Sequence, residues 1–581
     1  MRTFIGLVVL LTPAVALVQE NKLTVVYPPA NHQTNTDKIF FLGTAPPSGE
    51  VYINNQLINR SQSGHFAPSF PLQMGKNVFT VRHQNQEIQM QVTRVDVQQQ
   101  TPTQLGFIAD SLTPQVDIAR LPGEEICFSA IATSNAKIQV NLGQQTVNLT
   151  PQTQQISLPS NAAIYIDENQ PITQNIPGKY QGCTTLTTSG DIKQPEFQLT
   201  LNNQTITQVS PGKIHSLSPA KLPVVEVIAE AGVARTGPST TDSRLTPLPK
   251  GVRAAVTGKQ GDWLRLDYGG WIHRPETRTI PTAIPPRSHI RSIISQQLPT
   301  ATEIVFPLQV PVPVSIEQGD RTFTLTLHNT TAQTDTIRLD DNPMIARLDW
   351  QQIAPETVQY TFNLKNDQQW GYNLQYQDTS LVLSLRHPPT ISRRQQRPLS
   401  GLKILLNAGH GGEELGAAGP TGYLAKDLNL VVTKLLRDEL VRRGALVVMT
   451  REDDRDMSLV ARQRMIDQIE PAIALTFHYR FLPDDGDAEN TKGVSSYWYH
   501  PQAHSLAVLL QNRLVQDLGR SSFGVYWNNL ALTRPHTAPS VLLELGFMSN
   551  PDDFELAMNP QEQQRLARVL AEGIVEWFSS Q

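Results

Sequence analysis

The sequence predicts a multidomain chain in which several all-β modules precede one α/β domain. Its length of 581 residues is several times that of a usual domain. From about residue 22 to 388, short runs alternate apolar and polar residues between Pro, Gly, Asn and Asp, a pattern typical of antiparallel sandwiches and small barrels. From residue 402, short buried-type strands alternate with amphipathic helices, which indicates a mixed, mostly parallel sheet covered by helices.

The N-terminus has the features of a secretory signal. Arg2 precedes the apolar run FIGLVVLLTPAVAL, and Ala14-Val15-Ala16 has the small-x-small form that signal peptidase cleaves. The run is too short to span a bilayer comfortably, and no later apolar run is long enough to do so. We interpret residues 1–16 as a cleaved signal peptide, with an uncleaved anchor as the alternative. This interpretation predicts an exported protein of the periplasm or cell envelope, without a stable membrane span.

The net charge and the pI of the chain do not support two classes of partner, nucleic acids and membrane surfaces. The net charge is −4 and the pI is near 6.4. Neither value indicates a nucleic-acid partner or binding to a membrane surface.

The first two β modules are expected at residues 22–96 and 101–215. The stretches GTAPPSGEVYINNQLI and GHFAPSFPLQMGKNVFTV in the first are similar to immunoglobulin-like sandwiches attached to exported bacterial enzymes. The second holds the only two cysteines, Cys127 and Cys183. In an oxidising compartment the simplest expectation is one structural disulfide, and two free buried thiols are the alternative.

The third module is expected at residues 224–275, where VARTGPSTTDSRLTPLPKGVRAAVTGKQGDWLRLDYGGWIHR resembles the bacterial Src-homology-3-like barrel that often accompanies cell-wall hydrolases. Trp263, Tyr268 and Trp271 are candidates for a peptide- or glycan-binding face. The alternative is that the tryptophans belong to the barrel core, and for Trp271 we favour that alternative.

A fourth all-β module is expected at residues 285–388, vaguely similar to modules that target amidases to the envelope. The Pro- and Arg-rich run HPPTISRRQQRPLSG follows, and residues 389–400 within it are expected to form an extended linker.

The C-terminal domain is expected at residues 401–581. The strands are expected in KILLN, ALVVMT, PAIALTF, GVSSYWYH and PSVLLEL, with later helices at about 503–519 and 561–578. A helix opening at Ala425 has these apolar residues on one face: Leu428, Val431, Val432, Leu435 and Leu436. Gly444 after two arginines is a typical helix end.

Three ionisable residues of this domain fall at predicted strand ends, where chemistry collects in α/β sheets. His410 lies in the glycine-rich turn GHGG, where the backbone can approach a ligand closely. His478 ends the run IALTFH, and Glu544 interrupts the apolar run VLLELGF. Each residue alone has a structural explanation, but the three together predict a functional site.

The motifs AGHGG, GPTGYLAKDLNL, GALVVMTREDD, SLVARQR, LTFH and SVLLELGFMSNPDDFELA, in this order, resemble the zinc-dependent N-acetylmuramoyl-L-alanine amidases of bacterial cell-wall turnover. The resemblance covers residues 402–578 and is strongest to the cyanobacterial form, on LPDDGDAENTKG and VYWNNLALTRP. It implies peptidoglycan as the partner and hydrolysis of the amide between N-acetylmuramic acid and L-alanine, in cell-wall turnover or cell separation.

The resemblance also implies roles for individual residues. His410 and His478 match the two zinc-binding histidines, and Glu544 matches the catalytic carboxylate. Zinc lowers the pKa of a bound water and polarises a carbonyl, while a carboxylate transfers the water's proton to the leaving nitrogen. No other cofactor-binding residue is implied.

The sequence departs from the family pattern at the site itself. Ala425 stands at the zinc-binding Glu position, Asn407 at an Asp position and Arg480 at an Asn position. Because catalytic zinc sites normally have three protein ligands, we expect Ala425 to weaken zinc affinity. Asp427 should face elsewhere on the helix, whereas Glu414, with its neighbour Glu413, lies beside the glycine turn as a candidate substitute ligand.

Two hypotheses follow. The first is an active zinc amidase, supported by His410, His478 and Glu544. The second is a catalytically impaired homologue that binds peptidoglycan or regulates an active amidase, supported by Ala425. A carbohydrate hydrolase with paired carboxylates is disfavoured, because no convincing second acid accompanies Glu544. The sequence does not identify an envelope protein partner.

Overall fold

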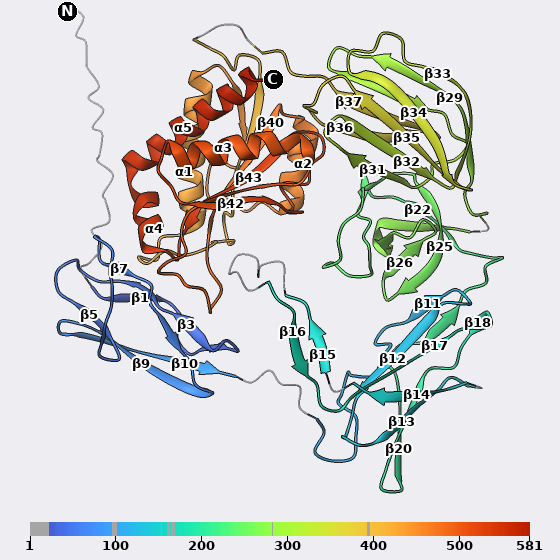
Figure 1. The fold of residues 1–581 in the computed structure, drawn as a ribbon, viewed down its shortest axis with the longest axis horizontal. Coiled ribbons are helices and arrows are strands. Elements are labelled where there is room, and N and C mark those ends of the chain that lie inside the picture. Colours follow the sequence, from blue (N-terminus) through green and yellow to red (C-terminus); the bar gives the residue numbers. More distant parts are fainter. Residues whose placement is uncertain are drawn as a thin grey trace, which may run out of the picture.

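The computed structural model describes residues 22–95, 101–143, 145–152, 154–159, 163, 169–281, 283–391 and 396–581. The predicted signal peptide at residues 1–16 lies outside the described residues. No helix of the described part is long and apolar enough to cross a membrane. Four β modules lead to the C-terminal α/β domain, and the first module returns to lie beside that domain (Figure 1). The predicted order of a β array followed by an α/β domain is confirmed.

The N-terminal module, residues 22–95, forms sheets of order β1-β4-β7, β2-β10-β9-β5-β6 and β3-β8 around one apolar core. Its strands are β1 (Thr24–Tyr27), β2 (His32–Thr34), β3 (Lys38–Phe40), β4 (Leu42–Thr44), β5 (Val51–Ile53), β6 (Gln56–Leu57), β7 (His65–Phe66), β8 (Ser69–Pro71), β9 (Gly75–His83) and β10 (Gln86–Arg94).

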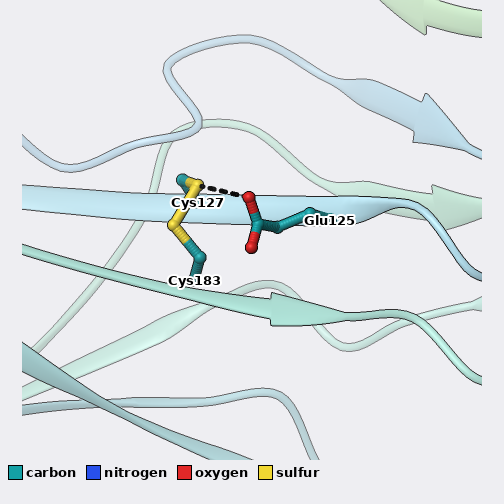
Figure 2. A group of neighbouring side chains, drawn as sticks. All are labelled: Glu125, Cys127 and Cys183. Atoms are coloured by element: carbon teal, nitrogen blue, oxygen red, sulfur yellow. Dashed lines mark hydrogen bonds between the residues drawn. A yellow bond between two sulfur atoms is a disulfide. The ribbon is translucent and has the colours of Figure 1, made fainter.

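The second module, residues 101–217, is built on a six-stranded sheet of order β12-β17-β14-β13-β19-β20. Cys127 of β12 lies opposite Cys183 of β17, and a disulfide joins them (Figure 2). The strands are β11 (Ile118–Arg120), β12 (Glu125–Ile131), β13 (Lys137–Asn141), β14 (Thr146–Pro151), β15 (Gln154–Ser157), β16 (Ile172–Asn175), β17 (Lys179–Thr185), β18 (Gly190–Asp191), β19 (Glu196–Leu201), β20 (Gln204–Val209) and β21 (Ile214–Ser216).

The third module runs to residue 280, beyond the predicted end at 275, because β28 hydrogen-bonds to β22. Its sheet continues into the second module through the β11–β25 pair. Trp271 is buried, as a core residue should be, and Trp263 is half-buried. The elements are β22 (Val224–Val227), β23 (Ala231–Gly232), β24 (Leu248–Pro249), β25 (Arg253–Gln260), β26 (Trp263–Leu266), β27 (Trp271–His273), η2 (Arg274–Glu276) and β28 (Thr277–Ile280).

The fourth module, residues 288–386, packs a five-stranded sheet of order β33-β29-β30-β37-β36 against a four-stranded sheet of order β31-β32-β35-β34. Its strands are β29 (Ser288–Gln297), β30 (Ala301–Phe306), β31 (Val314–Gln318), β32 (Thr322–His328), β33 (Thr330–Arg338), β34 (Ile345–Ala354), β35 (Thr357–Leu364), β36 (Tyr372–Gln377) and β37 (Ser380–Arg386).

The C-terminal domain has a six-stranded sheet of order β39-β38-β40-β43-β41-β42. Its first four strands in that order are parallel, while β41 and β42 run antiparallel to β43, so the predicted mixed sheet is confirmed. The elements are β38 (Lys403–Ala408), α1 (Ala425–Arg442), β39 (Leu446–Met449), α2 (Leu459–Ile469), β40 (Ile473–Arg480), β41 (Val494–Trp498), η3 (Pro501–Ala503), α3 (His504–Gln516), β42 (Ser522–Trp527), β43 (Ser540–Phe547), α4 (Pro551–Met558) and α5 (Pro560–Ser579).

Helices cover both faces of this sheet. The main core joins the sheet to α1, α3, α4 and α5, and a smaller cluster around Ile466 of α2 covers the other face. Val431 departs from the predicted apolar face of α1 because it is 36% exposed. Leu399, expected in the linker, is fully buried in the domain core and donates its N–H to the carbonyl of Arg443. The predicted linker therefore ends before Leu399.

The N-terminal module docks on the loop that follows β40. The Tyr27 hydroxyl and His32 Nε2 both bond the carboxylate of Asp484, the latter at 2.8 Å. A cluster of apolar side chains from the two domains surrounds this polar contact: Phe40, Leu42, Ala67, Leu482, Ala488 and Phe547. Residues more than 400 positions apart in sequence thus hold the loop next to β40.

Candidate active site

Two histidines meet at the carboxyl ends of neighbouring parallel strands. His410 follows β38, and His478 lies near the end of β40. The Nε2 of His410 is 3.3 Å from the Nδ1 of His478, and the rings meet edge to face at a centroid distance of 4.7 Å. The sequence placed both residues at strand ends, and the parallel register brings them together.

Glycines make room for the two imidazoles. A Cβ atom on Gly409 would lie 2.4 Å from His478 Nε2, and one on Gly416 would lie 2.5 Å from His410 Cδ2. His410 itself has a positive φ of 59°, which non-glycine residues seldom adopt. A side chain at either glycine would therefore displace a ring, so the glycine-rich turn sets the positions of the histidines.

His478 is held in the neutral form. Burial is the largest cause that lowers its pKa to about 3, and the charges of His410, Arg462 and Arg451 lower it further. A neutral imidazole has a free lone pair for a metal ion or for a proton. The electrostatics of the site therefore suit His478 to the role of a ligand.

Glu544 lies beside His478. The two residues are register partners in the parallel pair of β40 and β43. Burial raises the pKa of Glu544 to about 7, against the opposing charge of Arg480. Its Oε2 is buried and has no hydrogen-bond partner among the described residues. A buried polar atom without a hydrogen-bond partner costs free energy of folding. This favours a role for Glu544 in binding water, substrate or a metal ion.

The residue at the expected position of the third zinc ligand has no donor atom. Ala425, the first residue of α1, is fully buried and carries only a methyl group. A metal ion could be held by three His, Cys, Asp or Glu residues whose ligand atoms lie within 4.8 Å of one another. In the described part of the chain, one group meets this condition: Glu125, Cys127 and Cys183. That group is exposed, and the disulfide occupies both of its sulfurs (Figure 2).

The histidine pair nevertheless fits a metal ion. Zinc–nitrogen bonds of about 2.0–2.1 Å in a tetrahedron place neighbouring donor atoms about 3.3–3.4 Å apart. The 3.3 Å between the two imidazole nitrogens matches this edge. The residues present therefore fit two of the three protein ligands of a catalytic zinc site, and Glu544, with its buried Oε2 free of hydrogen bonds from the described residues, lies next to them.

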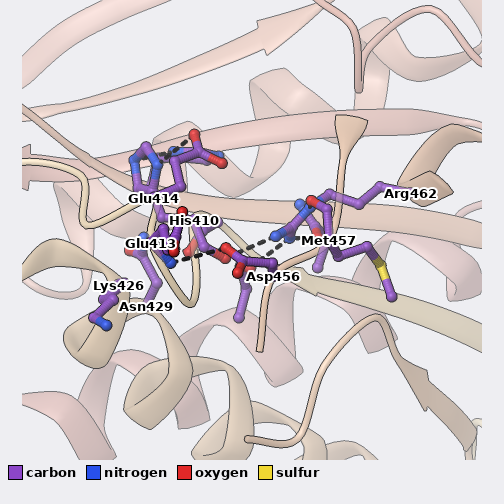
Figure 3. A network of polar contacts seen from close by, with 12 residues as sticks. His410, Glu413, Glu414, Lys426, Asn429, Asp456, Met457 and Arg462 are labelled. Atoms are coloured by element: carbon purple, nitrogen blue, oxygen red, sulfur yellow. Dashed lines mark hydrogen bonds and ion pairs between the residues drawn. The ribbon is translucent and has the colours of Figure 1, made fainter. Parts of the chain in front are cut away.

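Glu414 contacts the pair from the other side. Its Oε1 is 2.9 Å from His410 Nδ1 (Figure 3). The other ring nitrogen of His410, Nε2, is the one that meets His478. The contact with Glu414 orients the imidazole as the outer carboxylate of a metal-bound histidine does. In this arrangement Glu414 supports His410 and does not replace the missing ligand.

Two buried arginines hold the histidine turn and were not identified from the sequence. Arg451 donates to the carbonyls of Ala408 and Gly409, and Arg462 donates to those of Ala408 and His410. Figure 3 shows Arg462 and His410. In the sequence, the only indication of their role is their position in the motifs TREDD and VARQR. Because both side chains are almost fully buried, their donors fix the backbone on which His410 sits.

The other two residues that depart from the family pattern, Asn407 and Arg480, both form side-chain hydrogen bonds. Asn407 is fully buried, and its Oδ1 accepts hydrogen bonds from Thr450 Oγ1 and Arg462 Nη1. Arg480 donates to the Tyr497 hydroxyl at 2.6 Å and lies over that ring at 5.8 Å. Asn407 is thus part of the scaffold, whereas Arg480 adds positive charge near Glu544.

The region that contains these residues is similar to known proteins. Residues 404–576 match the family model described as N-acetylmuramoyl-L-alanine amidase. The probable cell wall amidase LytH of Staphylococcus aureus is 34% identical over 189 residues, which cover 32% of this chain and 62% of that protein. The chain therefore spans less than two thirds of the length of this curated relative.

The solved structures to which this chain is similar include two amidases. AmiC2 of Nostoc punctiforme, an N-acetylmuramoyl-L-alanine amidase, is 26% identical with a TM-score of 0.30, covering 31% of this chain and 99% of that chain. An N-acetylmuramoyl-L-alanine amidase from Clostridium difficile 630 is 24% identical with a TM-score of 0.30, covering 31% and 98%. Because both TM-scores are low, the similarity to the amidases rests on the sequence matches alone.

The matched range contains His410, His478 and Glu544 and lies within the α/β domain. Residues 404–576 of the C-terminal domain are therefore similar to the N-acetylmuramoyl-L-alanine amidases.

Proposed function

We propose that the chain hydrolyses the amide bond between N-acetylmuramic acid and L-alanine in peptidoglycan. In this proposal His410 and His478 hold a zinc ion, and Glu544 is the catalytic carboxylate. The observation that carries the proposal is the juxtaposition of an imidazole pair at tetrahedral spacing with Glu544, whose buried Oε2 has no hydrogen-bond partner among the described residues. Zinc bound there would polarise the amide carbonyl and acidify the attacking water.

The residues of the chain supply the proton transfer. With a pKa near 7, Glu544 exchanges a proton readily at neutral pH. It accepts the proton of the attacking water and returns it to the nitrogen of L-alanine as the amide bond breaks. His478 stays neutral throughout because burial keeps its pKa near 3. The hydrogen bond that His410 Nδ1–H donates to Glu414 keeps the ring of His410 oriented.

A second candidate function has its own support. Ala425 leaves the third ligand position without a donor, and a zinc ion with two neutral protein ligands should bind weakly. In this alternative the chain is an impaired amidase homologue that binds peptidoglycan or regulates an active amidase.

One experiment separates the two functions. The full chain and its Glu544→Gln and Ala425→Glu variants are incubated with isolated peptidoglycan and zinc, and newly exposed L-alanine amino groups are counted. Release by the natural sequence that is lost in Glu544→Gln supports the active amidase. Release that begins only in Ala425→Glu supports the impaired homologue. Release that Glu544→Gln leaves unchanged contradicts the proposed site.

The proposed location is the periplasm or cell envelope, reached by export through residues 1–16. Its support is the signal-like pattern around Arg2 and Ala16 and the cell-wall substrate of the proposed reaction. Fractionation of cells that produce the full chain, with N-terminal sequencing of the product, tests it. A product that starts at Met1 in the cytoplasm contradicts the proposal.

A further inference from the structure

A small cavity lies between the N-terminal module and the C-terminal domain. Its volume is about 270 Å³. The module supplies one wall, which includes residues 44–47 and His65, and the domain supplies the other, which includes Thr421 and Phe554. At this seam β7 of the module faces α4 of the domain (Figure 1). The cavity therefore exists only where the two parts of the chain meet.

Direct contacts join the two walls. The ring of His65 meets the ring of Phe554 edge to face at a centroid distance of 5.3 Å. The Ser63 N–H donates to Glu555 Oε1 at 2.8 Å. Together with the hydrogen bonds to Asp484, these contacts hold the module in one position on the domain. The cavity is thus a feature of the docked chain and not a gap between independent modules.

The domain wall of the cavity includes part of the turn that carries a proposed zinc ligand. Thr421 follows His410 in the turn that leads to α1. A Cβ atom on Gly419 would lie 2.2 Å from Phe554 Cε2, and Gly416 of the same turn packs against the His410 ring. The turn therefore contacts the imidazole at one point and the cavity wall at another. The cavity is next to the proposed site, but none of the described residues that line it belongs to that site.

The polar groups of the lining are mostly neutral. Thr44 Oγ1 is 2.8 Å from His65 Nδ1, and both residues are buried. Burial is the main cause that lowers the pKa of His65, so its ring is neutral at pH 7. Within the described part of the chain, neither His65 Nε2 nor the hydroxyl of Thr421 makes a hydrogen bond. A neutral imidazole and an aliphatic hydroxyl both pair well with the hydroxyl groups of a ligand.

The rest of the lining is apolar and carries little charge. Pro46, Pro47 and Met558 supply apolar surface beside Phe554. Among the described residues that line the cavity, Lys22 has the one charged side chain, and no side chain is a carboxylate. A cationic ligand would find no opposite charge there, and a stem peptide with several carboxylates would find a single ammonium group. A neutral ring with hydroxyl groups and an apolar C–H face matches both kinds of surface.

We propose that this cavity binds one neutral sugar ring of the peptidoglycan glycan strand, so that the N-terminal module forms part of the substrate-binding surface. Pockets for drug-sized ligands have volumes of about 300–1,000 Å³, and the smaller volume of this cavity suits a single ring. The identity of the polymer rests on the proposed function. The neutral character of the ligand rests on the lining itself.

Binding at this cavity would assist the reaction from a distance. The glycan strand carries the stem peptides, so a ring held in the cavity brings a neighbouring lactyl amide toward the turn that contains His410. Binding energy from a remote part of a substrate orients the bond that reacts. The sugar site should therefore change affinity for the glycan more than the proton transfer by Glu544.

Binding by the natural full chain tests the proposal. Calorimetry measures affinity for a chitin tetrasaccharide, which is a neutral glycan without peptide, and for the dipeptide L-alanyl-γ-D-glutamate. Neither probe contains the bond of the proposed reaction. Thr421→Trp should fill the cavity and weaken tetrasaccharide binding about tenfold or more. Thr421→Val removes only the hydroxyl and should weaken it about fivefold, as loss of one neutral hydrogen bond does.

Two controls accompany these variants. Thr207→Trp adds the same ring at an exposed threonine of β20 in the second module, and it should bind the tetrasaccharide as the natural chain does. Limited proteolysis shows whether the N-terminal module stays docked in Thr421→Trp, and Thr421→Val, which is close in size to the natural residue, keeps the test valid if it does not.

Three results overturn the proposal. The first is equal tetrasaccharide binding by the natural chain, Thr421→Trp and Thr421→Val. The second is no tetrasaccharide binding by the natural chain. The third is weaker binding of the dipeptide alone in the Thr421 variants, which would place peptide and not sugar in the cavity.

The amidase assay is independent of this outcome. If the natural chain releases no L-alanine but tetrasaccharide binding still depends on Thr421, the proposed activity fails and the sugar site stands. If release occurs and the Thr421 variants bind the tetrasaccharide normally, the sugar site fails and the activity stands.

Discussion

Glu544 and His478 are direct register partners in the parallel strand pair β43 and β40, and the carboxyl of Glu544 has a buried oxygen without a hydrogen-bond partner in the described structure. The neutral imidazole of His478 meets His410 at 3.3 Å. This short row of groups contains the donors and the acid–base group of the proposed reaction. What it lacks is a donor at Ala425.

Restoring that donor is the first prediction. Ala425→Glu should raise zinc affinity by on the order of tenfold or more, because each 1.4 kcal/mol of added interaction is tenfold in affinity. Amidase activity should rise with it. Competition against a chelating dye measures the affinity, and Ala425→Gln is the matched control of equal size without the charge. Equal affinity in the Glu and Gln variants would show that residue 425 does not face the metal.

The second prediction concerns the metal-free chain and pH. Because the pKa of Glu544 is about 7 in the folded chain and near 4.5 in the unfolded chain, its contribution to stability is fully present below pH 4.5. That contribution is lost as pH rises from 4.5 through about 7. In chelator, Glu544→Gln should therefore lose less stability than the natural chain between pH 5 and 8, as measured by urea unfolding. Parallel pH profiles of the two chains would contradict the raised pKa.

The third prediction has the opposite sign. Burial lowers the pKa of His500 to about 3 and that of His536 to about 4, from the ordinary value of 6.5. Their contribution to stability is present above pH 6.5 and is lost as pH falls toward 4, because the unfolded chain gains protons first. His500→Asn should flatten the fall in unfolding midpoint over this window. Replacing the exposed His289 by Asn should leave the profile unchanged.

The fourth prediction tests the docking of the N-terminal module. Asp484→Ala removes the acceptor shared by Tyr27 and His32, which should weaken docking by about 1–3 kcal/mol. Limited proteolysis followed by mass spectrometry should then release the module faster. Asp485→Asn is the control, since its carboxylate accepts no hydrogen bond from the described residues. Equal cleavage rates in all three chains would mean that the apolar cluster alone holds the module.

Several features could be predicted from the sequence because their signals are local. Alternating apolar residues identified the β array, and the change of periodicity at residue 402 identified the α/β domain. The glycines around His410 and the polar ends of apolar runs at His478 and Glu544 marked three residues that the structure brings together. Their roles in catalysis stay predictions.

Other features required the tertiary structure, because their parts are far apart in the chain. Periodicity says nothing about which strand ends meet, so the support of the His410 turn by Arg451 and Arg462 was not foreseen. Thus the sequence by itself determined the classes of the domains and three candidate site residues. Packing between distant segments decided which charges are buried, which are paired and which are left for a ligand.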